Sequence, residues 1–160
     1  MNALLSNSVH PSNARWYKAR MSIDVRILLP TDREAILAFE KARLADGPGD
    51  EMERELRAWT ARWRGEALDH YLGMGWSFGI FNRDRIEAYF LAQPFLFYRG
   101  LTQTLWVEHL TPGTPEQAHA LLDTAYRWAR DKHLQCVLLE DSAATRFALE
   151  QYPKAAGRGE

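Results

Sequence analysis

The sequence is poor in several features that would commit it to a particular compartment or partner. Its 160 residues include a single cysteine, so no intramolecular disulfide can form, which is typical of a reducing compartment. No apolar run approaches the roughly 18 residues that a membrane-spanning helix needs. The 20 Lys and Arg residues are matched by 21 Asp and Glu residues, for a net charge of −1, so no overall field attracts nucleic acid or an anionic membrane. We therefore expect a cytoplasmic protein that binds neither nucleic acid nor a membrane.

Signatures of metal and nucleotide chemistry are missing as well. The histidines and the lone cysteine show no zinc-ligand spacing, and there is neither a G-x-S-x-G elbow nor a Walker loop. Glycines gather in "GMGWSFG", but they precede a strand-like run and do not join a strand to a helix, so they predict a turn. We expect no metal site.

The composition that remains is typical of a globular domain. Hydrophobic residues make up 46% of the chain and charged residues 26%, and a chain of this length buries roughly two thirds of its unfolded surface. The opening segment is rich in Ser and Asn, so we expect residues 1–22 to form a loose N-terminal extension. Residues 23–160 are expected to form a single domain.

Strand-like and helix-like stretches alternate along this domain. Apolar and β-branched runs predict strands at 25–30, 76–81, 85–98, 102–110 and 134–140. Apolar residues at three- and four-residue steps predict helices at 32–45, 51–75 (as one helix or two), 114–133 and 142–152. Three consecutive strands indicate an antiparallel meander, and the strand, helix, strand crossover that follows indicates a parallel pair.

Local signals define some of these elements more closely. Thr31 with Glu34, and Thr114 with Gln117, have capping-box spacing at a helix start. Pro115 stands at the first position of the later helix, where its missing N–H costs nothing. The uninterrupted apolar run "LQCVLLE" predicts a strand buried on both faces, with its cysteine as a core thiol.

The element order resembles that of the GNAT superfamily of acyl-CoA-dependent N-acyltransferases. The stretches that carry the resemblance are "VRILLPTDREAILAFE" and "LWVEHLTPGTPEQAHALLDTAYRWARDKHLQCVLLED", and it extends over residues 23–152. It implies an α/β (α+β) fold: a mixed, mostly antiparallel sheet flanked by helices. It also implies transfer of an acyl group from acetyl-CoA or another acyl-CoA to a small-molecule or peptide amine.

The segment "LTPGTPEQA" lies where GNAT proteins carry R/Q-x-x-G-x-G/A, whose backbone amides hold the CoA pyrophosphate. The signature positions fall near Pro112, Pro115 and Gln117 and none matches, while a shifted register that uses Gly113 rescues one. Proline has no N–H, so two phosphate donors are lost, although the helix dipole and other amides remain. The resemblance assigns cofactor contacts to Val107, Leu110, Gly113, Thr114, Glu116, Gln117 and Ala118.

Two functions consequently stay open. One is an N-acyltransferase with a divergent CoA loop, and the other is a non-catalytic binding or protein-interaction module of the same fold that has lost CoA binding. GNAT proteins normally add two strands after the last helix, whereas this chain ends eight residues past Tyr152. An open sheet edge would then be available for a homodimer.

The candidate catalytic groups are Glu108, His109 and Tyr152. Glu108 is a candidate base for taking a proton from the amine, and His109 is a second one. Strand alternation is expected to place these two side chains on opposite faces of the sheet. The resemblance makes Tyr152 the candidate acid for the departing thiolate. The structural alternatives are a solvated or hydrogen-bonded Glu, a structural His and a packing Tyr.

The segment "RELRAWTARWRGE" borders the region where GNAT proteins bind the acceptor. Trp59, Arg62 and Trp63 could grip an anionic or flat substrate there. The alternative is an amphipathic helix whose tryptophans face the core and whose arginines pair with neighbouring glutamates. These glutamates are Glu51, Glu53, Glu55 and Glu66.

Overall fold

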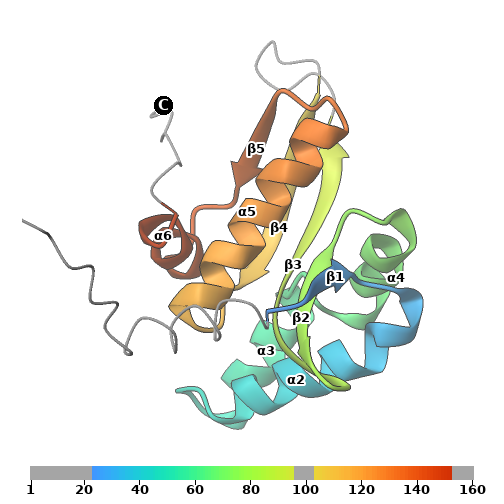
Figure 1. Ribbon diagram of the computed structural model, residues 1–160. Helices are drawn as coiled ribbons and strands as arrows, with labels where there is room; N and C mark the ends of the chain where they lie inside the picture. Colours follow the sequence, from blue (N-terminus) through green and yellow to red (C-terminus); the bar gives the residue numbers. More distant parts are fainter. Residues whose placement is uncertain (1–22, 96–102, 153–160) are drawn as a thin grey trace, which may run out of the picture.

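The computed structural model describes residues 23–95 and 103–152, which form one sheet with helices on both faces (Figure 1). The elements are β1 (Val25–Ile27), a 3-10 turn η1 (Pro30–Asp32), α2 (Arg33–Ala45), α3 (Glu51–Thr60), α4 (Gly65–Met74), β2 (Phe78–Asn82), β3 (Arg85–Phe95), β4 (Thr104–Thr111), α5 (Pro115–Asp131), β5 (Cys136–Leu139) and α6 (Ala143–Glu150). The strand order is β1-β2-β3-β4-β5, antiparallel except for the parallel pair β4 and β5. This confirms the expected fold class. The expected extension at 1–22 and the turn between β3 and β4 lie outside the described residues.

The two faces of the sheet are covered by different helices, and β3 shows why. Phe90 and Ala92 point into a core shared with α5 and α6, whereas Tyr89 and Leu91 point into a core shared with α2 and α4. Because β3 is central and buried on both faces, its sequence is an almost continuous apolar run. None of the helices in the described part of the chain is long and apolar enough to cross a membrane.

The helix starts follow the sequence signals at α5 but not at α2. Thr114 Oγ1 accepts the N–H of Gln117 and Gln117 Oε1 accepts the N–H of Thr114, so the capping box of α5 is confirmed. At α2 the chain enters through η1, and the carboxylate of Asp32 accepts the N–H of Leu29 at 2.7 Å. Asp32 also forms an ion pair with Arg26 at 2.8 Å. The expectation that Thr31 caps this helix is therefore wrong, because Asp32 takes up the entering backbone.

The strand β5 is half-buried along its whole length, so the expectation of burial on both faces is wrong. The reason is its place at the edge of the sheet. Val137 and Leu139 pack against the core on the α5 side. Cys136 is only partly buried, and its Sγ lies 3.2 Å from Thr104 Oγ1.

The pairing of strand β4 changes at Glu108 with both of its neighbours, β3 and β5. On the β3 side, His109 pairs with Leu91 and Val107 pairs with Ala92, so Glu108 is an extra residue, a β-bulge. On the other side, β5 pairs only with Thr104 to Val107 of β4. Among the described strands, none pairs with β4 beyond that point on this side, so the edge from residue 108 to residue 111 is open.

Candidate active site

The carboxylate of Glu108 is the centre of a buried polar group on the α4 side of the sheet. Its side chain is only 3% exposed. Tyr71 of α4 donates its hydroxyl to Oε2, and the amide of Gln93 on β3 donates to Oε1. Arg62, in the connection between α3 and α4, places its Nε 3.8 Å from Oε2. A buried carboxylate needs such donors and a nearby positive charge to remain ionised.

Tyr71 is held as a hydrogen-bond donor at this site. Burial, followed by the hydrogen bond and the charge of Glu108, raises the pKa of Tyr71 well above its ordinary value. The hydroxyl therefore stays protonated over the whole range in which proteins work. Sequence reasoning missed this role, because Tyr71 has the spacing of an apolar core residue between Leu68 and Leu72.

A pocket of about 520 Å³ lies beside this group, between α3 and α4. It is lined by Leu56, Trp59, Thr60, Ala61, Arg62, Arg64, Ala67 and Tyr71. Of the three residues expected to grip a substrate, Trp59 and Arg62 border the pocket. Trp63 does not, because it is 8% exposed and packs in the core with Leu68 and Tyr71.

The alternative interpretation of this segment is partly right. Trp63 faces the core as that interpretation requires, and Arg57 lies 3.7 Å from Glu53 in an ion pair. Trp59, however, is 77% exposed. The helix α3 ends at Thr60, so the direction of the chain changes between the two tryptophans and only one of them turns inward.

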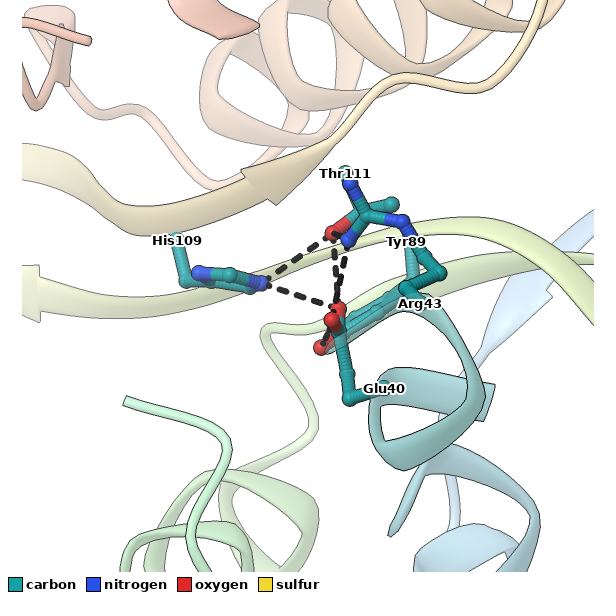
Figure 2. Close-up of polar contacts among 5 residues, drawn as sticks. All are labelled: Glu40, Arg43, Tyr89, His109 and Thr111. Atoms are coloured by element: carbon teal, nitrogen blue, oxygen red, sulfur yellow. Dashed lines mark hydrogen bonds and ion pairs between the residues drawn. The ribbon is translucent and has the colours of Figure 1, made fainter. Parts of the chain in front are cut away.

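His109 lies on the same face of the sheet as Glu108, so the expected alternation is wrong. The bulge at Glu108 adds one residue and turns both side chains toward α2 and α4. His109 Nε2 lies 3.3 Å from Glu40 Oε1 and 3.1 Å from Thr111 Oγ1. Figure 2 shows the imidazole ring turned toward these two side chains. Its ring is 5.3 Å from that of Tyr89. His109 therefore belongs to a second polar group centred on Glu40.

Glu40 of α2 is a buried carboxylate with several donors (Figure 2). The hydroxyls of Tyr89 and Thr111 donate to Oε1 at 2.7 and 2.8 Å, and Arg43 donates to Oε2 at 2.9 Å. Burial opposes ionisation, but the contacts with His109 and Tyr89 and the positive charges of His109 and Arg43 prevail and lower the pKa of Glu40 to about 2. The sequence did not single out Glu40, because its partners on β4 lie 69 and 71 residues away.

Several backbone N–H groups at the start of α5, where an anion could bind, are already hydrogen-bonded within the protein. The N–H groups of Thr114 and Gln117 are occupied by the capping box, and that of Ala118 donates to Thr114 O at 2.8 Å. Pro115 has no N–H. Within the described residues, the amides of Gly113 and Glu116 have no hydrogen-bond partner. Val107, Leu110 and Ala118 are buried in the α5-side core, so only their backbone could contact a cofactor.

Tyr152 lies away from Glu108, on the other face of the sheet. Its side chain packs in the α5-side core, edge to face with the ring of His119 at 5.2 Å. The hydroxyl donates to Asp123 Oδ1 at 3.3 Å, and burial together with that carboxylate raises the pKa of Tyr152. In the described part of the chain, the structure does not bring Tyr152 and Glu108 together, and no group of His, Cys, Asp and Glu is arranged to hold a metal ion.

Solved structures share this architecture at low sequence identity. A wild-type protein from Thermus thermophilus aligns with a TM-score of 0.59 and 18% identity, over 86% of this chain and 91% of its own. A ribosomal-protein-alanine N-acetyltransferase from Brucella melitensis biovar Abortus 2308 aligns with a TM-score of 0.58 and 15% identity, over 87% and 94%. A "predicted acetyltransferase with acetyl-CoA" from Clostridium acetobutylicum aligns with a TM-score of 0.57 and 14% identity, over 85% and 92%.

No protein-family model matches the chain, and no curated protein matches it by sequence. Identities of this size leave the likeness to solved structures as evidence of architecture. The central sheet, the parallel pair of β4 and β5 and the helices on both faces agree with that likeness. The chain therefore has the fold of the GNAT superfamily.

Proposed function

We propose that the protein is an N-acyltransferase that moves an acyl group from acetyl-CoA or another acyl-CoA to an amine. The observation that carries the proposal is the placement of Glu108. Its buried carboxylate lies at the bulge where β4 loses its β5 partner, and its donor Tyr71 lines the pocket between α3 and α4. The shared fold of two structures described as acetyltransferases, one of them with acetyl-CoA, supports the proposal.

Glu108 is suited to take a proton from the attacking amine. An amine is mostly protonated at neutral pH and needs a base before its nitrogen can attack. Tyr71 and Gln93 fix the carboxylate by donating to both of its oxygens, and Arg62 Nε lies 3.8 Å from Oε2. Because Tyr71 keeps its own proton, the proton from the amine goes to Glu108 or through it to water.

The cofactor would lie along the open edge of β4. Acyl-CoA, when bound, supplies a thioester whose acyl carbon is reactive toward amines. The backbone of residues 108–111 has no strand partner on the β5 side among the described residues, so its N–H and C=O groups can pair with an extended ligand. The amides of Gly113 and Glu116, with the dipole of α5, remain for the pyrophosphate.

One observation favours the non-catalytic alternative. The prolines at 112 and 115 and the capping box of Thr114 and Gln117 together remove most of the amides that a phosphate would use at the start of α5. If these losses abolish CoA binding, the fold serves as a binding module only.

Calorimetric titration with acetyl-CoA distinguishes the two functions. The acyltransferase proposal expects binding with a dissociation constant below about 1 mM. The double variant Thr114→Ala, Gln117→Ala frees two amides without changing the sheet. Binding by the unmodified chain supports the enzyme, whereas binding only by the double variant would show that the capping box has closed the site and would refute the proposal.

Turnover is measured as the release of free CoA thiol in the presence of a panel of amines. Replacement of Glu108 by Gln keeps the shape of the side chain and should lower the rate by about 10² to 10⁴, the usual contribution of a general base. Asp84→Asn, in the exposed turn between β2 and β3, is the matched control and should leave the rate unchanged. An active Glu108→Gln variant would exclude Glu108 as the base.

A further inference from the structure

The pocket between α3 and α4 has a composition that selects among amines. Its volume of about 520 Å³ lies within the range of roughly 300 to 1,000 Å³ that is usual for small-molecule sites. Among the described residues, the lining contains two guanidinium groups, those of Arg62 and Arg64, and no carboxylate. Tyr71, which lines the pocket, donates its hydroxyl to the carboxylate of Glu108 behind it.

The positive charge in this pocket is only partly neutralised. Arg62 shares its charge with Glu108 at 3.8 Å, beyond a direct hydrogen bond. Arg64 donates to the backbone oxygen of Trp59 at 3.3 Å, and within the described residues it forms no ion pair with a carboxylate. Two arginines with one distant carboxylate between them favour an anionic group in the pocket.

Two of the residues that line the pocket are large, apolar and exposed to solvent. Leu56 and Trp59 are 66% and 77% exposed and stand three residues apart on the same face of α3. Exposed side chains of this size that adjoin a pocket indicate a ligand-binding surface. An aromatic or branched aliphatic group would bury both of them.

We infer that the acceptor is an α-amino acid with an apolar side chain. Its amine would meet Glu108, its carboxylate would meet Arg62 and its side chain would cover Leu56 and Trp59, with Arg64 adding a second positive charge. Arg62 Nε lies 3.8 Å from Glu108 Oε2, so a small molecule whose amine and carboxylate are held on one carbon atom could reach both side chains. This inference rests on the proposed function for its chemistry, but the binding it describes is independent of acyl transfer.

The test begins with binding in the absence of acyl-CoA. L-Phenylalanine, 2-phenylethylamine, 3-phenylpropionate and glycine are titrated calorimetrically, since each of the last three lacks one feature of the first. L-Phenylalanine is expected to bind at least about tenfold more tightly than 2-phenylethylamine, which lacks the carboxylate, because a charge-assisted hydrogen bond contributes that much or more. Glycine, which lacks the apolar group, is expected to bind more weakly by a similar factor.

Variants test the contact of the ligand carboxylate with the arginines and the contact of its apolar side chain with Trp59. Arg62→Gln and Arg64→Gln should each reduce the preference for L-phenylalanine over 2-phenylethylamine by about tenfold or more, whereas a merely structural effect would weaken both ligands alike. Trp59→Ala should weaken both ligands. Arg57→Gln is the control, because Arg57 lies on α3, pairs with Glu53 and does not line the pocket.

The outcomes separate this inference from the proposed function. Arginine-dependent binding of L-phenylalanine without any acyl transfer supports the inference and counts against the enzyme. Acyl transfer to amines with no preference for a carboxylate overturns the inference and leaves the enzyme standing. Equal binding of L-phenylalanine and 2-phenylethylamine also overturns it, whatever the rate of acyl transfer.

Discussion

Replacement of Glu40 by Gln should destabilise the fold strongly at neutral pH and hardly at all in acid. Glu40 is 4% exposed and receives hydrogen bonds from Tyr89, Thr111 and Arg43 (Figure 2). Glutamine has the same shape but no charge, so the variant resembles the protein with Glu40 permanently protonated. The free energy lost is therefore the free energy that ionisation of Glu40 contributes to folding.

The magnitude follows from the shift in pKa. Lowering the pKa of Glu40 from an ordinary 4.5 to about 2 corresponds to about 3 kcal/mol, at about 1.4 kcal/mol for each unit. Because the pKa is depressed in the folded state, this contribution is fully present above about pH 4.5 and is lost as the pH falls toward 2. The difference in unfolding free energy between the protein and its variant should shrink over the same range.

Urea unfolding followed by tryptophan fluorescence at about pH 7, 5, 4 and 3 measures this difference. A loss of about 3 kcal/mol moves the midpoint by roughly 1 to 3 M urea. Glu34→Gln is the control on the same helix, because its side chain is 81% exposed and its ion pair should contribute less than about 1 kcal/mol. A loss below about 1 kcal/mol at neutral pH for Glu40→Gln, or a loss that stays constant into acid, would refute the reasoning.

Three further substitutions test the fold and the site. Trp63→Ala should cost about 3 to 5 kcal/mol of unfolding free energy, because Trp63 is buried. Trp59→Ala, at an exposed side chain, should change the unfolding free energy by less than about 0.5 kcal/mol. Equal costs in urea unfolding would contradict the burial of one tryptophan and the exposure of the other. Gly113→Ala should cost about 1 to 2 kcal/mol by thermal unfolding, because φ is +66° and a Cβ would meet Gln117 of the capping box; an unchanged midpoint would argue against this conformation. Tyr71→Phe should lower the rate of acyl transfer at least about tenfold, because it removes a hydrogen bond to Glu108, while Tyr152→Phe should lower it less. The reverse order would support the acid role predicted for Tyr152.

Local signals predicted much of the architecture in advance. The capping box at Thr114 and Gln117 was predicted correctly, because it joins residues only three apart. The three antiparallel strands and the later parallel pair were also predicted correctly, since short connections and crossovers constrain strand direction. The predicted N-cap at Thr31 failed for a local reason as well, because the carboxylate of the neighbouring Asp32 accepts the N–H of Leu29 where the chain enters the helix.

The side chains that contact Glu108 could not be predicted from local sequence signals. Glu108 was recognised from its place on β4, but its donor Tyr71 is 37 residues away and looked like an ordinary core residue. Arg62 was proposed for substrate binding, and its ion pair with Glu108 depends on how α3 and α4 are packed on the sheet. Neither contact has a sequence spacing that could have revealed it.

The sequence by itself determined the order and direction of the elements, because hydrophobic periodicity and capping act over a few residues. Only the tertiary structure decided which side chains share the site. The bulge at Glu108 depends on the register between β3 and β4, and one extra residue turned His109 onto the same face as Glu108, against strand alternation. The same packing left Trp59 in solvent and buried Trp63, four residues later in the chain. Register and helix packing are set by contacts across the sheet, and these exist only once the chain has folded.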